Sequence, residues 1–350
     1  MLTGAIAFSV ALLASLTLTV PVRQLALRVG MVDHPGPRKV HLTPIPLLGG
    51  LAIYCGVVLA VLVSVDSQVR AQIVGILAGA TLVALVGILD DQGLLHHQIK
   101  LFVGMPVAAL ILLVSGIRAQ VFSPVLPGQA GQFADAVLTI LWVVGITASF
   151  SILDHMDGLC AGVAAMASIF FTIFATLSGQ VLVSTLAAAV VGAAVGFLRW
   201  NFNPAKIFMG DGGAMFLGFL MATLALKLRP TGLPHATCWM VPVLILGVPL
   251  FDTTLVSISR SRRGLVPFAT PGKDHTAHRL ANLGLGPRWA VLALYALGGV
   301  FGLLALLVSR LPVRQSFLLA GLTVLAVLVG VALLERAPYE RQRAQRTTAE

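Results

Sequence analysis

Long apolar runs separated by short polar segments dominate this chain. The runs lie near residues 2–22, 47–65, 71–89, 101–117, 133–153, 159–178, 181–198, 213–228, 236–258, 289–309 and 316–334. A helix needs about 20 consecutive apolar residues to cross a bilayer, and most of the runs come close to that length. The pattern therefore predicts an all-α, polytopic membrane protein with about 11 transmembrane helices.

The composition strengthens this prediction. Of 350 residues, 58% are hydrophobic and 10% are charged, and the mean hydropathy is +0.97. An average soluble domain is about 25% charged, so an ordinary soluble enzyme, a disordered chain and a secreted disulfide scaffold are all excluded. Cys55, Cys160 and Cys238 lie in apolar surroundings without the spacing of metal ligands. We expect them to be inert packing residues.

The cations predict the orientation. The first run precedes its first cation, Arg23, which is typical of a retained span with its N-terminus outside rather than of a signal peptide. With that start, 17 of the 23 Lys and Arg residues fall on the inner side, as the positive-inside rule requires. The net charge of +10 thus follows from topology and anionic lipid, and no nucleic-acid partner is expected.

No soluble domain stands out between the runs. The longest polar connection is 259–288, so we expect a single transmembrane catalytic domain over residues 1–335 and a basic cytoplasmic tail over 336–350. Pairs of glycines four residues apart predict close helix packing; they are Gly75 and Gly79, Gly158 and Gly162, and Gly192 and Gly196.

The acidic residues are distributed unevenly. Eight of the thirteen fall in inner connections or at the inner ends of runs: Asp33, Asp90, Asp91, Asp154, Asp157, Asp211, Asp252 and Asp274. A carboxylate near an apolar helix end is costly and is by default a functional candidate. Helix capping or solvation in a loop stays open as the alternative for any one of them, but is less favoured for several that converge on one face.

The local spacing of these aspartates suggests separate roles. Asp90 and Asp91 end an apolar run, and neighbours on a helix point about 100° apart, so each can act differently. Asp154 and Asp157 are three residues apart and are expected to share a helix face. Asp211 is followed by two glycines and a predicted helix, whose N-terminal N–H groups would favour an anion. Such carboxylates suit Mg²⁺ beside a phosphate or diphosphate, and no P-loop motif is present.

Basic residues lie on the same predicted side. They come from two connections and comprise Arg38, Lys39 and His41, then Lys273, His275, His278 and Arg279. No HExxH motif accompanies the histidines, so zinc is not favoured. Carboxylates for a metal ion, opposed by cations for phosphates, indicate phosphoryl transfer at the membrane surface.

Six motifs now carry a family resemblance. In chain order they read DHPGPRKVHLTPIPLLGG, GILDDQGLLHHQIK, LDHMDGL, NFNPAKIFMGDGGAMFLG, VPLFDTT and PFATPGKDHTAHRL, and they span about residues 33–285. Together they resemble the polyprenyl-phosphate N-acetylhexosamine-1-phosphate transferases of glycosyltransferase family 4, which have eleven spans. The RKxHxxPIPxxGG form is similar to the undecaprenyl-phosphate GlcNAc-1-phosphate transferase branch more than to the peptidoglycan branch.

The resemblance implies a reaction and the residues that carry it. A polyprenyl phosphate oxygen would attack the β-phosphate of a UDP-sugar, giving polyprenyl-diphospho-sugar and UMP, with Mg²⁺ or Mn²⁺ as cofactor. Asp211 and Asp91 would hold the metal, and Asp90 would act as a base or handle the lipid phosphate. His275 and His278 match the catalytic basic loop. Positions matching substrate-binding residues are Arg38, Lys39, His41, Lys100, Asp154, Asp157, Asn201 and Arg279.

The resemblance also implies a cellular setting. The enzyme would lie in the plasma (inner) membrane with its active site on the cytoplasmic face, and would start the assembly of a cell-envelope glycan. Its partners would be a UDP-sugar, a polyprenyl phosphate and membrane lipids, and a homodimer is left open.

The chain departs from the family pattern at several positions. The family places asparagines six and three residues before the first Asp of its NxxNxxDxxDG motif, where this chain has Ala148 and Ser151. His155 occupies a usual glycine site, and Ala277 replaces a histidine of many relatives. Because the lost amides are hydrogen-bonding groups, we expect altered contacts with the donor.

Other readings fit the sequence less well. A CDP-alcohol phosphotransferase would continue its DxxDG motif with an Arg and two further Asp residues, which are absent after Asp157. An intramembrane aspartyl protease would need GxGD, but Phe208 stands two residues before Gly210. A transporter would place charges near the bilayer midplane, where Asp252 alone could serve. The alternatives kept are a transferase of the peptidoglycan lipid I type and, from another class, a membrane transporter.

Overall fold

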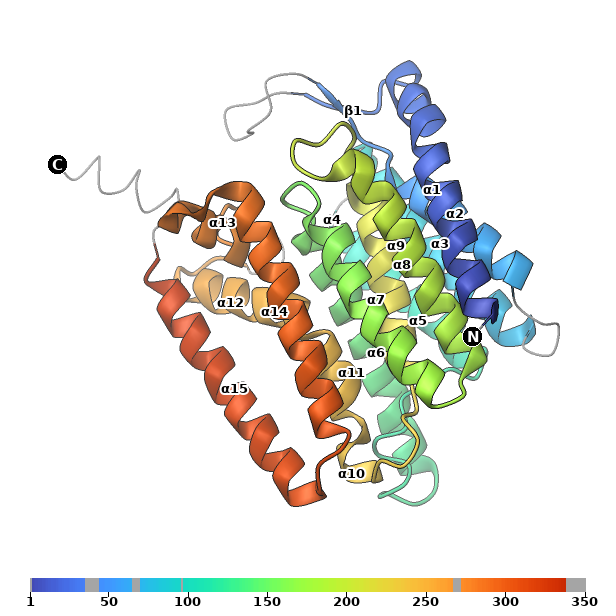
Figure 1. The fold of residues 1–350 in the computed structure, drawn as a ribbon, viewed down its shortest axis with the longest axis vertical. Helices are drawn as coiled ribbons and strands as arrows, with labels where there is room; N and C mark the ends of the chain where they lie inside the picture. The colour runs from blue at the N-terminus through green and yellow to red at the C-terminus, as the bar shows by residue number, and fades with distance from the viewer. Residues whose placement is uncertain (1, 35–43, 65–69, 96, 267–271, 338–350) are drawn as a thin grey trace. The chain divides into compact units, whose positions relative to one another are not determined.

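The computed structural model describes residues 2–34, 44–64, 70–95, 97–266 and 272–337. These residues are almost entirely helical (Figure 1), with one two-stranded sheet among them, so the predicted all-α class is confirmed. The chain forms two compact units, Met1–His235 (unit 1) and Ala236–Glu350 (unit 2). The predicted catalytic domain over 1–335 would therefore be built from both units.

Helices long and apolar enough to cross a membrane number seven in the described part of the chain, or eight if a bent pair forms one span. Helices suit such sequences because backbone groups in lipid must find their hydrogen bonds within the chain. The seven are α1 (Leu2–Arg28), α3 (Arg70–Asp91), α6 (Gln129–Leu153), α7 (Leu159–Leu177), α8 (Val181–Asn201), the continuous stretch Thr276–Val308, and α15 (Val313–Glu335). A multi-pass membrane protein follows from this set.

Shorter helices correspond to the remaining apolar runs of unit 1. They are α2 (Gly50–Ser64), the π-helical turn η2 (Lys100–Gly104) continued by α5 (Met105–Val114), and α9 (Gly210–Lys227). A single turn, α4 (His97–Ile99), precedes η2. Each predicted apolar run thus overlaps a helix or a broken helix, while the number of eleven spans stays a prediction.

Helix α9 forms the core of unit 1. All of its residues except Asp211 and Lys227 are buried, and it packs against α2, α3, α6, α7 and α8. Helix α1 packs against α8 across the third predicted glycine pair: a Cβ at Gly192 would lie 2.2 Å, and one at Gly196 2.6 Å, from a main-chain oxygen of α1. Close helix packing at this pair is therefore confirmed.

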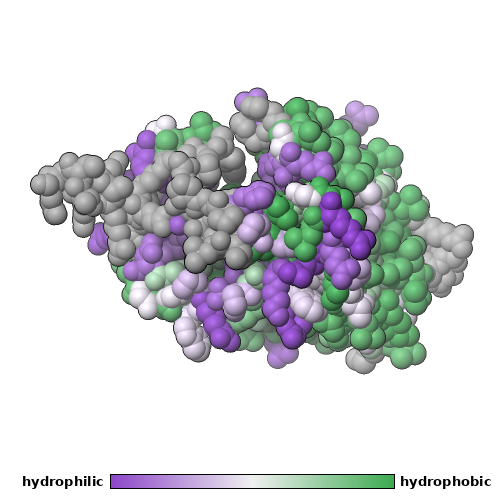
Figure 2. All heavy atoms as spheres, turned by 90° about the horizontal axis from the view of Figure 1, so that it is seen from above, coloured by the Kyte–Doolittle hydropathy of each residue, from purple (hydrophilic) through white to green (hydrophobic). Residues whose placement is uncertain are grey.

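One end of unit 1 carries the connections that precede α2 and α9. Strands β1 (Val32–Asp33) and β2 (Ile45–Pro46) pair antiparallel there. The N–H groups of Gly49 and Gly50 then donate to the carbonyls of Phe208 and Met209, at 2.9 and 2.8 Å. The proline- and glycine-rich turn therefore holds the segment that leads into α9. Figure 2 looks onto this end from above and shows hydrophilic side chains gathered beside hydrophobic flanks.

Unit 2 contains the broken span. Helix α10 (His235–Cys238) leads into α11 (Met240–Ile245), and α12 (Gly247–Arg262) leaves at an angle of 74°. The bend brings Gly247 against Phe301 so closely that an added Cβ would lie 2.5 Å from the ring. The predicted apolar run over 236–258 thus forms a bent pair of helices rather than one continuous helix.

The rest of unit 2 packs around α12. Helix α13 (Thr276–Leu280), the π-helical turn η3 (Ala281–Leu285) and α14 (Gly286–Val308) follow one another, and α12 packs against both α14 and α15. Phe251 and Leu255 of α12 bury their side chains with Val331 of α15. The polar residues at the end of α12 are thereby held next to the loop that begins at residue 272.

Candidate active site

Two aspartates at the end of α3 meet one at the start of α9. The helices approach backbone to backbone, because a Cβ at Gly87 would lie only 2.5 Å from the Gly212 nitrogen. The Asp91 carboxylate accepts hydrogen bonds from the backbone N–H of Asp211 at 2.9 Å and of Gly212 at 3.2 Å. Asp91 therefore caps α9 and lies at the positive end of its helix dipole.

This arrangement corrects the predicted anion site. The first N–H groups of α9 were expected to face a bound phosphate, but the Asp91 carboxylate accepts two of them. Gly210 makes this contact possible: its φ is +76°, and a Cβ there would lie 2.5 Å from the Asp91 Oδ2 atom. A side chain at position 210 would thus be both strained and in collision with the carboxylate.

Lys100 joins the two other carboxylates. Its Nζ atom, at the start of η2, donates to Asp90 Oδ2 at 2.6 Å and to Asp211 Oδ2 at 2.5 Å. The side chains of Lys100, Asp90 and Asp211 are 18%, 16% and 22% exposed, so ligands in solution can reach them. Asp90 and Asp91 have different partners, in agreement with their predicted divergence on the helix.

Ser151 of α6 completes the group, which we call the carboxylate cluster: Asp90, Asp91, Lys100, Ser151 and Asp211. The Ser151 hydroxyl donates to Asp211 Oδ1 at 2.7 Å. The two oxygens of Asp211 are thus held by donors from different elements. Sequence reasoning treated Ser151 as part of the donor pocket and did not connect it with Asp211.

The cluster fits a divalent cation. The cluster contains three carboxylates and one ammonium, which leaves an excess of negative charge when all are ionised. One oxygen each of Asp90 and Asp211 lies within 2.6 Å of the Lys100 Nζ atom, so both reach a common cation position. Mg²⁺ is typically held by one or two carboxylates together with substrate phosphates. Asp211 and Asp90 are therefore the carboxylates that could hold a cation together, whereas both oxygens of Asp91 accept backbone N–H groups. The metal site itself stays a prediction.

The connection between α6 and α7 carries the predicted nucleotide pocket. Asp154 and Asp157 were expected on one helix face, but α6 ends at Leu153 and α7 begins at Leu159, so this expectation is wrong. Gly158 breaks the helix with a φ of +76°. The Asp157 carboxylate accepts from Asn203 Nδ2 and from the Ala205 N–H, both at 3.0 Å.

Asn201 links the same connection to the segment before α9. Its Oδ1 accepts from the Gly158 N–H at 3.0 Å, and its Nδ2 donates to the Ile207 carbonyl at 2.9 Å. Its side chain is buried. Asn201 and Asp157 therefore both join the α6–α7 connection to the segment that precedes α9.

Asp154 differs from these two residues. Within the described part of the chain, no hydrogen bond or ion pair reaches its carboxyl group, which is partly exposed. Burial raises the pKa of Asp154 well above its usual range, and the negative charges of Asp211, Asp91 and Asp157 raise it further. The Asp154 carboxyl group is therefore available to a ligand.

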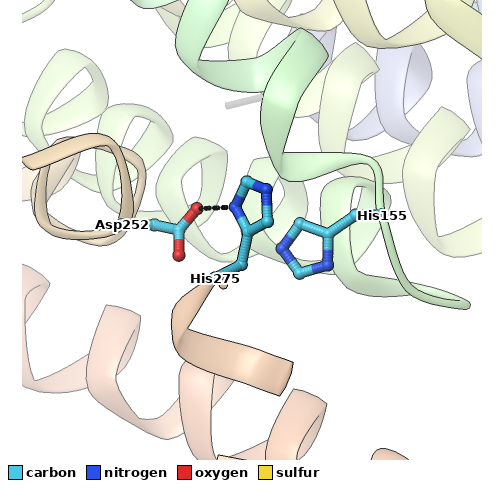
Figure 3. Close-up of side chains that lie close together, drawn as sticks. All are labelled: His155, Asp252 and His275. Atoms are coloured by element: carbon cyan, nitrogen blue, oxygen red, sulfur yellow. Dashed lines mark hydrogen bonds and ion pairs between the residues drawn. The ribbon is translucent and has the colours of Figure 1, made fainter. Parts of the chain in front are cut away.

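In unit 2, a buried carboxylate orients one of the predicted histidines. His275 Nδ1 lies 2.9 Å from Asp252 Oδ2 (Figure 3), and the Thr276 N–H donates to Asp252 Oδ1 at 2.7 Å. With a proton on Nδ1, the Nε2 atom of His275 is left as an acceptor, and Arg260 Nη2 lies 3.4 Å from it. Asp252 thus fixes the direction of the imidazole ring.

Asp274 lies between two arginines from the end of α12. Arg260 donates to it through Nη2 at 2.8 Å and through Nε at 3.1 Å, and Arg263 forms a second ion pair. Burial alone would raise the pKa of Asp274, but the hydrogen bonds from Arg260 and Arg263 hold it well below its usual range. The carboxylate is therefore ionised throughout the physiological pH range.

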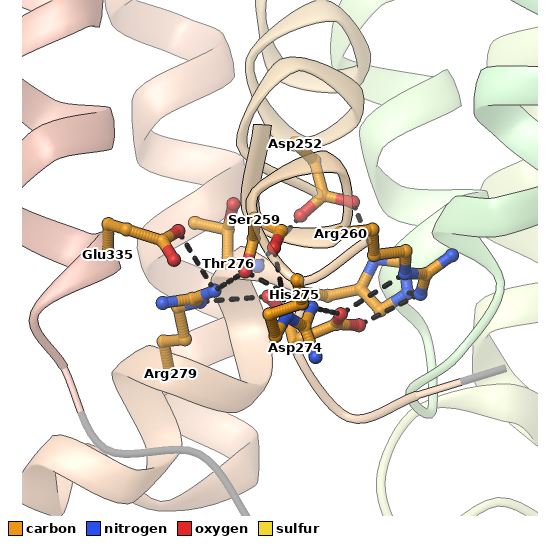
Figure 4. A network of polar contacts seen from close by, with 9 residues as sticks. Asp252, Ser259, Arg260, Asp274, His275, Thr276, Arg279 and Glu335 are labelled. Atoms are coloured by element: carbon orange, nitrogen blue, oxygen red, sulfur yellow. Dashed lines mark hydrogen bonds and ion pairs between the residues drawn. The ribbon is translucent and has the colours of Figure 1, made fainter. Parts of the chain in front are cut away.

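Arg279 is enclosed by the same network (Figure 4). Its guanidinium is fully buried and donates to the carbonyls of Asp274 and Leu334, at 2.8 and 2.7 Å, and to Ser259 Oγ at 2.7 Å. Glu335 lies 3.3 Å away. The predicted substrate contact of Arg279 does not fit this burial, and the residue instead connects α12, α13 and α15.

We call Arg260, Arg263, Asp274 and Arg279 the arginine cluster. No motif in the sequence predicts this cluster, because Arg260 and Arg263 have the pattern of cations that follow an inner helix end. His278, the second predicted histidine, is half-buried, and its ring centroid lies 6.1 Å from that of His275. Arg38, Lys39 and His41 lie outside the described residues.

Comparisons with known proteins agree with the geometry. The glycosyl transferase family 4 model matches residues 73–229. A probable undecaprenyl-phosphate N-acetylglucosaminyl 1-phosphate transferase of Bacillus subtilis is 38% identical over 317 residues, which cover 89% of this chain and 86% of that protein. A decaprenyl-phosphate N-acetylglucosaminephosphotransferase of Mycolicibacterium smegmatis is 31% identical, with 91% and 85% covered. An undecaprenyl-phosphate alpha-N-acetylglucosaminyl 1-phosphate transferase of Yersinia pestis is 26% identical, with 90% and 87% covered.

Proposed function

This chain belongs to glycosyl transferase family 4, and we propose that it transfers a sugar-1-phosphate, N-acetylhexosamine-1-phosphate above all, from a UDP-sugar to a polyprenyl phosphate. A phosphate oxygen of the lipid attacks the β-phosphorus of the UDP-sugar. The bond from that phosphorus to the oxygen bridging it to the α-phosphate breaks, and UMP leaves. The products are polyprenyl-diphospho-sugar and UMP, so the reaction starts a lipid-linked glycan.

The observation that carries this proposal is the carboxylate cluster at a membrane-helix end. Asp211 and Asp90 meet at one cation position, next to Asp154, whose carboxyl group has no protein partner in the described residues. A diphosphate donor and a phosphate acceptor need such a cation, because their negative charges would otherwise repel one another and the carboxylates. The names of all three relatives above refer to the same two groups, a polyprenyl phosphate and an N-acetylglucosamine phosphate.

We propose Mg²⁺, with Mn²⁺ as a substitute, as the cofactor, held by Asp211 with Asp90 or Asp91. When bound, it would neutralise charge on the transferring phosphoryl group. Lys100 holds Asp90 and Asp211 in place, and its ammonium lies where it can also pair with a phosphate oxygen. The lipid phosphate has a second pKa near 6 and is largely ionised at pH 7, so the reaction does not require a strong base.

The residues of the predicted nucleotide pocket have two different roles in this proposal. Asp157 and Asn201 hold the α6–α7 connection against the segment that precedes α9, through hydrogen bonds with backbone groups. Asp154 offers its carboxyl group to the nucleotide. In unit 2, Asp252 fixes the ring of His275, which would act on the substrate through Nε2, the atom that Arg260 Nη2 approaches to 3.4 Å.

We further propose the plasma membrane as the location, with the site on the cytoplasmic side. The seven long helices, the bent pair, α2, the stretch Lys100–Val114 and α9 would make the eleven spans. With the N-terminus outside, the cation-rich connections and the carboxylate cluster then share the inner side, in accord with the positive-inside rule.

The test uses the full chain purified in detergent, a polyprenyl phosphate and a panel of UDP-sugars, with UMP release as the readout. We expect release with UDP-N-acetylhexosamines in the presence of Mg²⁺ or Mn²⁺ and none in EDTA. If no donor gives UMP with either metal, the proposed function is wrong. The panel includes the UDP-linked precursor of peptidoglycan lipid I, which tests the alternative branch. Solute uptake by vesicles containing the protein, without UMP release, would instead support a transporter.

A further inference from the structure

Ser151 stands where the family pattern has an asparagine, and the structure gives it a partner that the pattern does not suggest. Its hydroxyl donates to Asp211 Oδ1 at 2.7 Å. A hydrogen bond from a hydroxyl to an ionised carboxylate is of the strong, charge-assisted kind. The other replaced position, Ala148, is buried one turn earlier in α6 and has no polar side-chain atom. Of the two departures, Ser151 is therefore the one that touches the carboxylate cluster.

The Asp211 side chain is held from two directions. Ser151 of α6 holds Oδ1, while Lys100 of η2 holds Oδ2 at 2.5 Å. The backbone of the same residue is fixed by the bond from its N–H to Asp91. Without the hydroxyl, the Lys100 ammonium alone would hold the Asp211 carboxylate, which could then turn about its Cβ–Cγ bond when a divalent cation takes the place of that ammonium.

We propose that Ser151 is a positioning residue for the metal site: it turns the Asp211 carboxylate so that Oδ2 faces the position shared with Asp90. Groups that orient a metal ligand in this way typically contribute 10- to 100-fold to metal affinity. The hydroxyl of Ser151 therefore acts on how this chain holds its cation, rather than on which donor sugar it accepts. This inference rests on the proposed function, since it takes Asp211 as a metal ligand.

A matched serine makes the experiment specific. Ser149 lies two residues earlier in α6, is buried, and donates only within its own helix, to the Gly145 carbonyl at 2.8 Å. Ser151→Ala removes the hydrogen bond to Asp211, whereas Ser151→Thr keeps a hydroxyl at this position. Ser149→Ala removes a hydroxyl that does not contact any residue of the carboxylate cluster. Ser151→Cys keeps the size of serine but offers only a weak donor, and it replaces the alanine variant if that protein does not fold.

The first readout is Mn²⁺ binding without substrates, measured as the loss of the free-ion signal in electron paramagnetic resonance. We expect Ser151→Ala or Ser151→Cys to raise the dissociation constant about tenfold or more, and Ser151→Thr and Ser149→Ala to leave it at the wild-type value. The second readout is the Mg²⁺ dependence of UMP release. The alanine variant should need more Mg²⁺ for half its maximal rate, with kcat restored at saturating Mg²⁺ and the ranking of donor sugars unchanged.

Each outcome decides the inference. An unchanged Mn²⁺ dissociation constant in Ser151→Ala and Ser151→Cys would overturn it, as would a changed donor ranking at wild-type metal affinity. An equal loss of affinity in Ser149→Ala would also overturn it, because the effect would then come from α6 as a whole. If the wild-type protein releases no UMP, the proposed function has failed first, and the two failures are thereby distinguished.

Discussion

The carboxylate cluster of unit 1 and the arginine cluster of unit 2 are built from the same kinds of groups in opposite proportions. In the first, the ammonium of Lys100 pairs with two of the three carboxylates, those of Asp90 and Asp211, whose side chains are 16% and 22% exposed. In the second, the guanidiniums of Arg260 and Arg263 pair with the Asp274 carboxylate and that of Arg279 donates to the Asp274 carbonyl. The first is short of positive charge and partly exposed, whereas the second has an excess of positive charge and is mostly buried, with Arg260 and Asp274 each 3% exposed and Arg263 23% exposed.

This difference separates a binding site from a scaffold. A buried ion pair contributes little net stability, but breaking one leaves an unpaired charge in a medium of low polarity and costs several kcal/mol. Substitutions in the arginine cluster are therefore expected to lower the free energy of unfolding. Substitutions in the carboxylate cluster, which has to accept a cation, are expected to lower the rate of turnover.

The largest effect is expected at Asp211. Asp211→Asn removes a charge from the common cation position while keeping the shape of the side chain, and we expect turnover to fall about a thousandfold, equivalent to about 4 kcal/mol of transition-state stabilisation. UMP release measures it. The control is Asp135→Asn, at the other end of unit 1, where the carboxylate accepts three backbone N–H groups. That variant should lower the melting temperature and keep kcat; a wild-type rate in Asp211→Asn would remove it from the metal site.

A comparable effect, this time on stability, is expected from Arg260. Arg260→Gln leaves the buried Asp274 carboxylate without its two-pronged partner, and we expect a loss of about 3 kcal/mol in the free energy of unfolding. The melting temperature in detergent is the readout. Arg262→Gln, two residues away on an exposed side chain, should change it little. Equal effects of the two substitutions would mean that the arginine cluster is no scaffold.

Asp252→Asn is expected to lower turnover, but by less than Asp211→Asn. The variant removes the carboxylate that accepts a hydrogen bond from His275 Nδ1, so the orientation and the tautomer of the ring are no longer fixed. We predict a fall in kcat of about 10- to 100-fold with little change in the KM for the UDP-sugar. A change in KM alone, with kcat unchanged, would indicate that His275 binds the donor without taking part in the transfer.

The smallest effect concerns acid. The folded pKa of Asp274 lies below its usual value near 3.9, so its contribution to stability is present above about pH 4 and is lost as the pH falls further. Melting temperatures of the wild type should therefore drop more steeply below about pH 4 than those of Asp274→Asn. Parallel curves for the two proteins would show that this carboxylate titrates normally in the folded chain.

The sequence predicted the position of the helices better than their direction. Each apolar run found a helix because lipid demands internally satisfied backbone groups. The 74° bend at Leu246 and Gly247 was not predictable, since hydropathy is the same for a straight and a broken helix. Likewise, Asp154 and Asp157 have the spacing of a helix face, yet the turn at Gly158 places them in a connection.

For the site, the sequence predicted which residues share one side but not which atoms meet. Asp91 and Asp211 are 120 positions apart, and topology brings them to one end of unit 1. Their contact through backbone N–H groups depends on the close approach of α3 and α9. Arg260 and Arg262 are equivalent as cations in the sequence, but one is buried and the other exposed, which only the packing of α12 determines.

The meeting of Gly87 and Gly212 has a consequence for how such a site can vary. The separation between the aspartates of α3 and the start of α9 is set by two positions that have no side chain. Every possible amino-acid replacement at either position adds at least a Cβ, so no conservative substitution exists there. Positions without functional groups thus constrain the site as tightly as the carboxylates do. A mutational history of this region would find neighbours such as Ser151 freer to change than the glycines.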